Sequence, residues 1–177
     1  MKLFTIGFTK KNAEDFCTRL QRAGVRRVVD IRLNNTSQLA GFAKADDLKY
    51  FLKAIANIDY VYMPELCPTQ DILDAFKKSK GSWNDYTRSF NLLIEGRNIS
   101  GTVPRELLDD GCLLCSEDTP EHCHRRLVAE YLRDRWDDRR DGLARHGGPG
   151  PPPAGLGDLS DAFDGERATT SADLWHL

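Results

Sequence analysis

Short apolar runs alternate with amphipathic segments through the first 140 residues of the chain. The apolar runs are rich in Val, Ile and Leu and are bounded by polar residues or glycine, a pattern typical of buried strands. They predict strands at residues 3–8, 25–33, 60–63 and 112–116. Because helical patterns separate the strands, the sheet is expected to form from crossover units.

The segments between these strands carry apolar residues at helical spacing, and polar residues suited to capping precede several of them. The predicted caps are Asn12, Thr69, Ser82 and Thr119. Gly24 is expected to end the first helix, and Pro120 follows the last cap at the first helical position, where proline is favoured. Further helical segments are expected around residues 48–55 and 104–109.

This order predicts an α/β fold: an open, mostly parallel sheet of about four strands with helices on both faces. The domain is expected to span residues 1–140. Beyond it, residues 147–155 read Gly-Gly-Pro-Gly-Pro-Pro-Pro-Ala-Gly, which neither a helix nor an inner strand tolerates. We therefore expect residues 141–177 to form a disordered, acidic, Gly/Pro-rich tail.

Net charge, the length of the apolar runs and the cysteine count argue against several classes of protein. The net charge is −2, and much of the acidic excess falls in the tail, so the domain lacks the strong basic character of most nucleic-acid-binding proteins. No apolar run reaches the roughly 18 residues that a membrane span needs, and the amino terminus resembles a strand rather than a signal peptide. The five cysteines are odd in number, which favours reduced thiols in a cytoplasmic protein.

Residues suited to binding or catalysis follow each predicted strand. They are Gly7 and Thr9, Asp30 and Arg32, Glu65, and Ser116 and Glu117. Parallel strands end at one edge of a sheet, where ligands bind, so these residues are expected to converge. Asp30 and Arg32 share a strand face, so Asp30 either orients Arg32 toward a phosphate or carboxylate or forms a structural ion pair with it. The chain lacks both G-x-G-x-x-G and a P-loop lysine.

Residues 112–126 concentrate three of the five cysteines and two of the four histidines. One interpretation is a zinc site, with Cys112 and Cys115 opposite a second cluster at residues 122–124. Strand alternation weakens it, because positions three apart point to opposite faces of a sheet. A second interpretation makes Cys112, like Cys17 and Cys67, a buried core residue, with Cys115 also packed in the core.

A third interpretation is an anion and thiol site at the start of the last helix. Backbone N–H groups there favour negative charge, and a nearby cation would stabilise a thiolate at Cys123. The cationic residues are His124, Arg125 and Arg126, whereas Glu117, Asp118 and Glu121 oppose them. The tyrosine-phosphatase pattern is absent, because Ala129 stands where that pattern requires arginine. For Cys123 and His124 the functional and structural interpretations both remain open.

Several separated motifs together resemble one family. They are Thr5-Ile-Gly-Phe-Thr9, Val29-Asp-Ile-Arg32, Gly41-Phe-Ala-Lys44 preceded by Ser37, Pro64-Glu-Leu66, Cys112-Leu-Leu-Cys-Ser-Glu117 and His122-Cys-His-Arg-Arg126. Over about residues 3–136 the chain resembles the DUF488 family, a domain of unknown function. The resemblance implies importance for Gly7, Asp30, Arg32, Ser37, Phe42, Lys44, Glu65, Cys115, Glu117, Cys123, His124 and Arg125. Cys67 departs from the family pattern, which argues against a catalytic role for it.

The sequence favours an enzyme or ligand-binding domain for a small anionic substrate, such as a nucleotide or phosphorylated metabolite, at the carboxyl edge of the sheet. The predicted binding residues are Gly7, Asp30, Arg32, Ser37, Lys44 and Arg125. Glu65 or Glu117 is the expected general acid or base, assisted by Cys123 or His124. The sequence does not identify a cofactor.

Two other hypotheses stay open. One is a non-catalytic module that binds nucleic acid or protein through a basic helix face, formed by Arg125, Arg126, Arg133, Arg135, Arg139 and Arg140. The other is a metal-binding protein that uses the Cys/His cluster.

Overall fold

A computed structural model describes residues 1–36 and 41–137 of the chain. Its four-stranded sheet consists of β1 (Leu3–Gly7), β2 (Arg27–Asp30), β3 (Asp59–Tyr62) and β4 (Gly111–Cys115). All pairings are parallel, and the strand order is β1-β4-β2-β3. The predicted α/β fold is confirmed, whereas the predicted tail at residues 141–177 lies outside the described residues.

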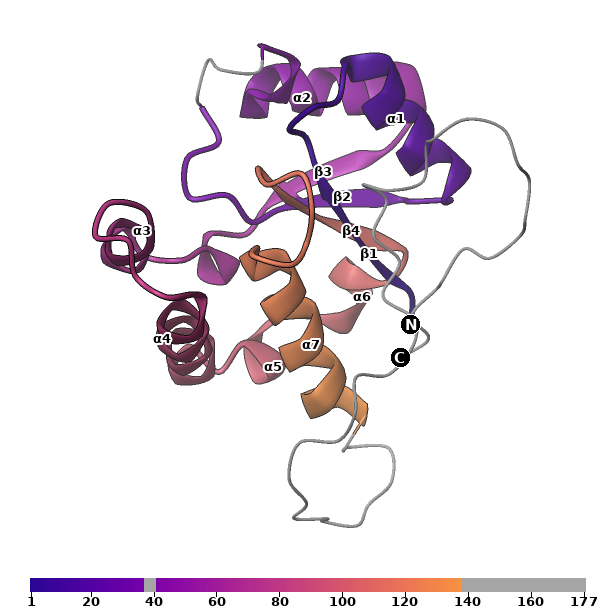
Figure 1. The fold of residues 1–177 in the computed structure, drawn as a ribbon. Coiled ribbons are helices and arrows are strands. Elements are labelled where there is room, and N and C mark those ends of the chain that lie inside the picture. Colours follow the sequence, from indigo (N-terminus) through magenta and orange to yellow (C-terminus); the bar gives the residue numbers. More distant parts are fainter. Residues whose placement is uncertain (37–40, 138–177) are drawn as a thin grey trace, which may run out of the picture.

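Helices cover both faces of the sheet (Figure 1). On one face lie α1 (Ala13–Arg22) and α2 (Ala45–Phe51), which a π-helical turn at Leu52–Ala56 extends. The other face carries α4 (Trp83–Gly96), α5 (Ile99–Thr102), α6 (Arg105–Leu108) and α7 (His124–Asp137). The short α3 (Gln70–Lys77) packs on α4, and 3-10 turns occupy Gly41–Ala43 and Pro64–Leu66.

The strand order is the one expected if every crossover connection between parallel strands is right-handed. The connections from β1 to β2 and from β2 to β3 run in one direction across the sheet and use helices on one face. The connection from β3 to β4 runs back and uses the opposite face, as a right-handed crossover then requires. This return inserts β4 between β1 and β2, so the end of β4 lies at the centre of the sheet edge.

Side chains of β4 alternate between two apolar cores. Cys112 and Leu114 pack with Phe16 and Leu48 on the α1 and α2 side, whereas Leu113 packs with Phe90 and other residues on the opposite side. Cys115 contacts α7, on the same side as Leu113. Cys112 and Cys115 therefore lie on opposite faces, as the two-residue period of a strand predicts.

The predicted helix starts are confirmed at three positions. The side chains of Asn12, Thr69 and Ser82 each accept a hydrogen bond from a backbone N–H three residues later. Gly24 follows α1 with a φ of 71°, a left-handed conformation suited to glycine. Within the described ranges, no helix combines the length and apolar character needed to cross a bilayer.

The predicted start of the last helix is wrong. We expected it at Thr119 and Pro120, but α7 begins at His124, and residues 116–123 form a loop. The backbone N–H of Cys123 donates to the Pro120 carbonyl at 3.1 Å, which closes a turn just before the helix. The loop first passes over the end of β1, where the Glu117 carbonyl lies against Gly7, and only then enters the helix.

Gly7 is expected to tolerate no side chain. A Cβ atom at this position would lie 1.6 Å from the Glu117 carbonyl oxygen, so Gly7→Ala must displace the loop or the strand. We expect this variant to lose about 3 kcal/mol of unfolding free energy in urea denaturation. Gly96→Ala is the control, because a Cβ at Gly96 meets no atom within 4 Å, and its stability should stay the same or rise slightly. Equal stability of the two variants would contradict the close approach.

Candidate functional site

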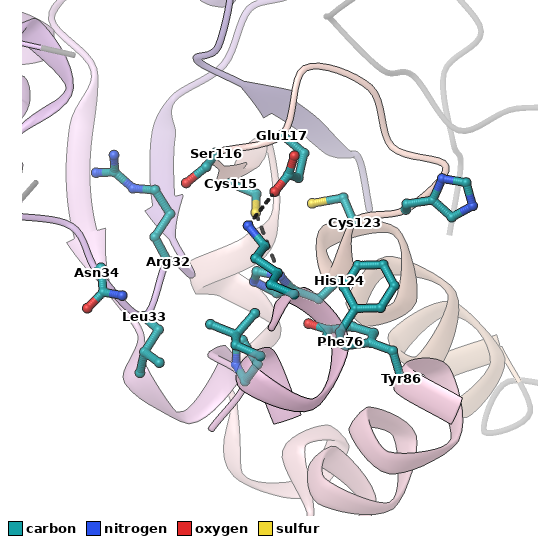
Figure 2. Close-up of a pocket in the computed structure, with 14 residues that line it drawn as sticks. Arg32, Leu33, Asn34, Phe76, Tyr86, Cys115, Ser116, Glu117, Cys123 and His124 are labelled. Atoms are coloured by element: carbon teal, nitrogen blue, oxygen red, sulfur yellow. Dashed lines mark hydrogen bonds and ion pairs between the residues drawn. The ribbon is translucent and has the colours of Figure 1, made fainter. Parts of the chain in front are cut away.

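Three side chains meet at the carboxyl end of β4 (Figure 2). Cys115 ends the strand, Cys123 ends the loop that follows, and His124 is the first residue of α7. Their sulfur and ring nitrogen atoms all lie within 4.8 Å of one another. Exposures of 5%, 2% and 6% show that protein surrounds nearly the whole cluster. We call these three residues the thiol–imidazole cluster.

The His124 ring is fixed by a backbone carbonyl. Its Nε2 lies 2.8 Å from the Ile31 carbonyl oxygen, just beyond β2. Because a carbonyl oxygen can only accept, Nε2 carries a proton and donates it. Nδ1 then faces the Cys115 sulfur at 3.6 Å, while the ring packs against Phe90. A link between β2 and α7 therefore orients the imidazole toward the thiol of β4.

The cluster also shifts the proton affinities of its members. A hydrogen bond from the Cys123 thiol, followed by the attraction of His124, holds the pKa of Cys115 well below its ordinary value despite burial. Burial, followed by the nearby Cys115, raises the pKa of Cys123 well above its ordinary value. Burial alone would lower the pKa of His124, but Cys115 raises it overall. Cys115 is therefore the member that most readily becomes a thiolate.

A small cavity, the inner pocket, adjoins the cluster. It is lined by Arg32, Leu33, Asn34, Pro68, Leu73, Phe76, Lys77, Tyr86, Cys115, Ser116, Glu117, His122, Cys123 and His124. Its volume of about 110 Å³ is smaller than the roughly 150 Å³ of a cavity that binds benzene. The inner pocket therefore has room for one small group of a ligand, but not for a whole nucleotide.

A larger cavity of about 740 Å³, the outer pocket, lies beside it. It is lined by Phe8, Thr9, Lys10, Lys11, Asn12, Ala13, Arg32, Asn34, Phe42, Ala43, Lys77 and Ser116. These described residues include four cations and no carboxylate. The first turn of α1 also borders the cavity, and its backbone N–H groups favour an anion there. Arg32, Asn34, Lys77 and Ser116 line both pockets.

Carboxylates pair with the lysines of the outer pocket without lining it. Asp118 lies 3.1 Å from Lys10 and 2.9 Å from Lys11, and these two lysines lower the pKa of Asp118, with Lys11 contributing most. Lys77 lies 2.9 Å from Glu117. Glu117, predicted as a catalytic residue, therefore lies at the inner pocket with its carboxylate against a lysine shared by both pockets.

The predicted pair of Asp30 and Arg32 is present and buried. The Arg32 Nη2 donates to the Asp30 Oδ2 at 2.7 Å, and Nε donates to Oδ1 at 2.8 Å. Tyr60 donates to Asp30, and Arg32 also donates to the Ala43 carbonyl. Burial alone would lower the pKa of Arg32, but Asp30 raises it above its ordinary value. The guanidinium is thus held where the two pockets meet.

Arg125, predicted to bind an anion, instead contacts the backbone. Its Nη1 donates to the Glu117 carbonyl at 2.6 Å, and its Nη2 donates to the Asp118 carbonyl at 3.1 Å. The side chain is fully buried beneath the loop. Arg125 therefore stabilises the loop of residues 116–123 and is not among the residues that line either pocket.

The other predicted site residues are dispersed. The space in front of Gly7, where we expected a ligand to approach, is occupied by the Glu117 carbonyl. Glu65 lies in the 3-10 turn after β3 and Lys44 precedes α2, and neither lines the two pockets. Ser37 lies outside the described residues. Of the residues expected to converge, Thr9, Arg32, Ser116 and Glu117 line the two pockets, and Asp30 lies behind Arg32 as its hydrogen-bond partner.

Sequence analysis missed three residues of this region, Lys10, Lys11 and Lys77. Cys115 was considered both as a zinc ligand and as a core residue and belongs to the family pattern, but it was not among the predicted catalytic residues. Lys10 and Lys11 lie in the loop between β1 and α1, close to the carboxyl end of a strand, which was a usable signal. Lys77 ends α3 and gave no local signal, because its position depends on how α3 packs.

The remaining thiols belong to the cores. Cys17, Cys67 and Cys112 are buried, and burial raises the pKa of Cys67 to about 12. The core interpretation of these cysteines is consistent with the structure. Cys112 is therefore not part of the thiol–imidazole cluster, although its spacing from Cys115 had suggested a shared zinc site.

Replacing Arg125 tests its contact with the loop. Arg125→Lys keeps the charge but loses the planar fork, which leaves at least one of two carbonyls without its donor. We expect about 2 kcal/mol less unfolding free energy in urea denaturation. The control is Arg126→Lys, because Arg126 is partly exposed and a lysine can still pair with Glu130, so its change should stay within about 0.5 kcal/mol. Equal losses would contradict a structural role specific to Arg125.

Comparisons with known proteins place the chain in a family. The family described as "Domain of unknown function DUF488" matches residues 12–132, which is more than half of the chain and includes the whole cluster. Neither the curated proteins nor the solved structures gave a match. The chain belongs to the DUF488 family, as its separated motifs predicted.

Proposed function

We propose that the protein binds a small anionic molecule in the outer pocket and acts on one end of it at the thiol–imidazole cluster. The observation that carries this proposal is the lining of the outer pocket, with four cations and no carboxylate among the described residues. Its volume of about 740 Å³ falls within the roughly 300–1,000 Å³ typical of pockets for small ligands. The anion is therefore the part of the ligand that the outer pocket recognises.

The shared wall of the two pockets supports an extended ligand. Arg32 and Lys77 line both cavities, so an anionic group held between them has one side toward the inner pocket. The inner pocket admits only a small group and ends at the cluster. This arrangement suits a molecule whose charged part binds outside while a smaller reacting part enters.

The proposed roles of individual residues follow from these positions. Lys10, Lys11 and Lys77 bind the anion, helped by the N–H groups at the start of α1. Glu117 lies at the inner pocket and is the candidate general acid or base. Arg32 orients the ligand at the boundary.

The basic helix face gives less support to nucleic-acid binding. Arg125 is buried, and Arg126 and Arg133 pair with carboxylates of their own helix. Arg135 pairs with Glu95 of α4. Arg139 and Arg140 lie outside the described residues. The cations of the outer pocket also pair with carboxylates, but they line one cavity whose described lining contains no carboxylate, so the outer pocket is the better candidate for binding an anion.

Two adjacent lysines provide a matched test. Lys77 lines both pockets, whereas Lys78 pairs with Asp74 and lines neither, and their side chains are 59% and 72% exposed. We expect Lys77→Gln to weaken the binding of inorganic phosphate or pyrophosphate about tenfold, because a charge-assisted contact is lost. Isothermal titration calorimetry at low salt measures both anions.

Lys78→Gln removes the same charge from the next residue, which follows the end of α3, and should leave the dissociation constant nearly unchanged. Rising salt should weaken the binding of wild-type protein, since the contact is electrostatic. If wild-type protein binds neither anion, or if both variants weaken binding equally, the outer pocket is not an anion site.

A further inference from the structure

We propose that Cys115, Cys123 and His124 are the ligands of a Zn²⁺-class metal ion whose fourth coordination position opens into the inner pocket. This inference deepens the proposed function, because it identifies the centre beside which the reacting end of the anion would lie. It rests on the geometry of the three side chains and on the atoms that orient them.

The separation of two of the proposed ligand atoms fits tetrahedral coordination. The Cys115 sulfur and the His124 Nδ1 lie 3.6 Å apart. With a Zn–S distance of about 2.3 Å and a Zn–N distance of about 2.05 Å, the corresponding tetrahedral edge is about 3.6 Å. All three ligand atoms lie within 4.8 Å of one another, and the tetrahedral edge between two zinc-bound sulfurs is about 3.8 Å, so a shift of about 1 Å or less brings the second sulfur to the same ion.

The surroundings of His124 are those of a metal ligand. A histidine that binds a metal through one nitrogen usually donates its other N–H to a carbonyl or carboxylate. His124 does so from Nε2 to the Ile31 carbonyl at 2.8 Å, which leaves Nδ1 facing the cluster.

Charge and ligand type favour the same class of ion. Two thiolates and one neutral imidazole form a soft to borderline donor set, which suits Zn²⁺ rather than Mg²⁺ or Ca²⁺. The two thiolate charges neutralise a divalent cation, so the complex adds no net charge to a buried site. A bound ion would thus satisfy two buried sulfurs and a buried ring nitrogen together.

The proposed ion would keep one open position. The described cluster supplies three protein ligands, which is the number typical of catalytic zinc sites, whereas structural zinc sites have four. Cys112 faces the other core, and His122 packs its ring on Trp83 outside the cluster. Because all three ligands line the inner pocket, a water molecule or a ligand oxygen can occupy the fourth position there. Such an ion would polarise that oxygen as a Lewis acid.

Metal binding is tested directly on the full chain. The reduced protein, freed of metal with a chelator, is titrated with Zn²⁺ and followed by native mass spectrometry, and Co²⁺ is used as a spectroscopic probe. We expect one ion per chain, and Co²⁺ should show both thiolate charge-transfer absorption and the intense visible bands of tetrahedral coordination. Absence of a stoichiometric ion, or a Co²⁺ spectrum without thiolate bands, would overturn the proposal.

Matched variants identify the ligands. Cys115→Ser, Cys123→Ser and His124→Gln should each weaken Zn²⁺ binding more than about 100-fold, since changes outside the ligand set alone cost about 10- to 100-fold. Cys112→Ala and His122→Gln are the controls from the same motif and should bind Zn²⁺ like wild type. If a control loses as much affinity as the cluster variants, the assignment is wrong. Circular dichroism checks folding, and the Co²⁺ spectrum of wild-type protein tests the ligands without any variant.

The two proposals fail separately. Lys77→Gln should keep full Zn²⁺ affinity while losing phosphate affinity, because Lys77 is outside the ligand set. If phosphate binds but no metal does, and iodoacetamide modifies Cys115 rapidly, the cluster is a free thiol site and the metal inference is overturned. If Zn²⁺ binds but no anion does, the metal site stands and the proposed function fails.

Discussion

The geometry of the site depends on the hydrogen bonds that the buried guanidinium of Arg125 donates to the backbone of one loop. By donating to the carbonyls of Glu117 and Asp118, the guanidinium fixes the loop that carries the chain from β4 back to α7. A loop with free carbonyls would leave this region open to many conformations, whereas two charge-assisted bonds select one. Because Gly7 lacks a side chain, the loop also lies directly on the end of β1. Together these contacts hold the loop so that Cys123, at its end, lies close to Cys115, at its start.

The position of β4 in the sheet then joins this loop to the rest of the site. Since β4 lies between β1 and β2, its end is flanked by the first turn of α1 on one side and by Ile31 and Arg32 on the other. The loop that leads from β1 into α1 contributes Lys10 and Lys11 to the outer pocket, and the Ile31 carbonyl fixes the ring of His124. A strand at the edge of the sheet would have had only one such neighbour. Because β4 lies in the middle of the sheet, the outer pocket and the thiol–imidazole cluster lie next to each other.

Local chemistry predicted much of this structure, and long-range packing explains the rest. Caps at Asn12, Thr69 and Ser82 and the alternation of Cys112 with Cys115 depend on a few adjacent residues, so the sequence indicates them directly. The start of α7 could not be predicted in this way. Thr119 can cap a helix and Pro120 suits its first position, but the loop that contains them passes over the end of β1 before the helix begins at His124. The role of Arg125 and the meeting of Lys77 with Glu117 likewise depend on contacts between distant segments.

The acidic residues of the loop bear on how a metal centre and an anion site can share one edge. From the sequence, Glu117 and Asp118 oppose an anion at the cluster, since they add negative charge nearby. In the structure Glu117 pairs with Lys77, and Asp118 pairs with Lys10 and Lys11, so much of this charge is directed at cations. Each of these three lysines therefore has a carboxylate partner, and the two thiols of the cluster are buried. An anion that displaced these carboxylates from the lysines would free Glu117 beside the cluster, which is where a general base would be needed.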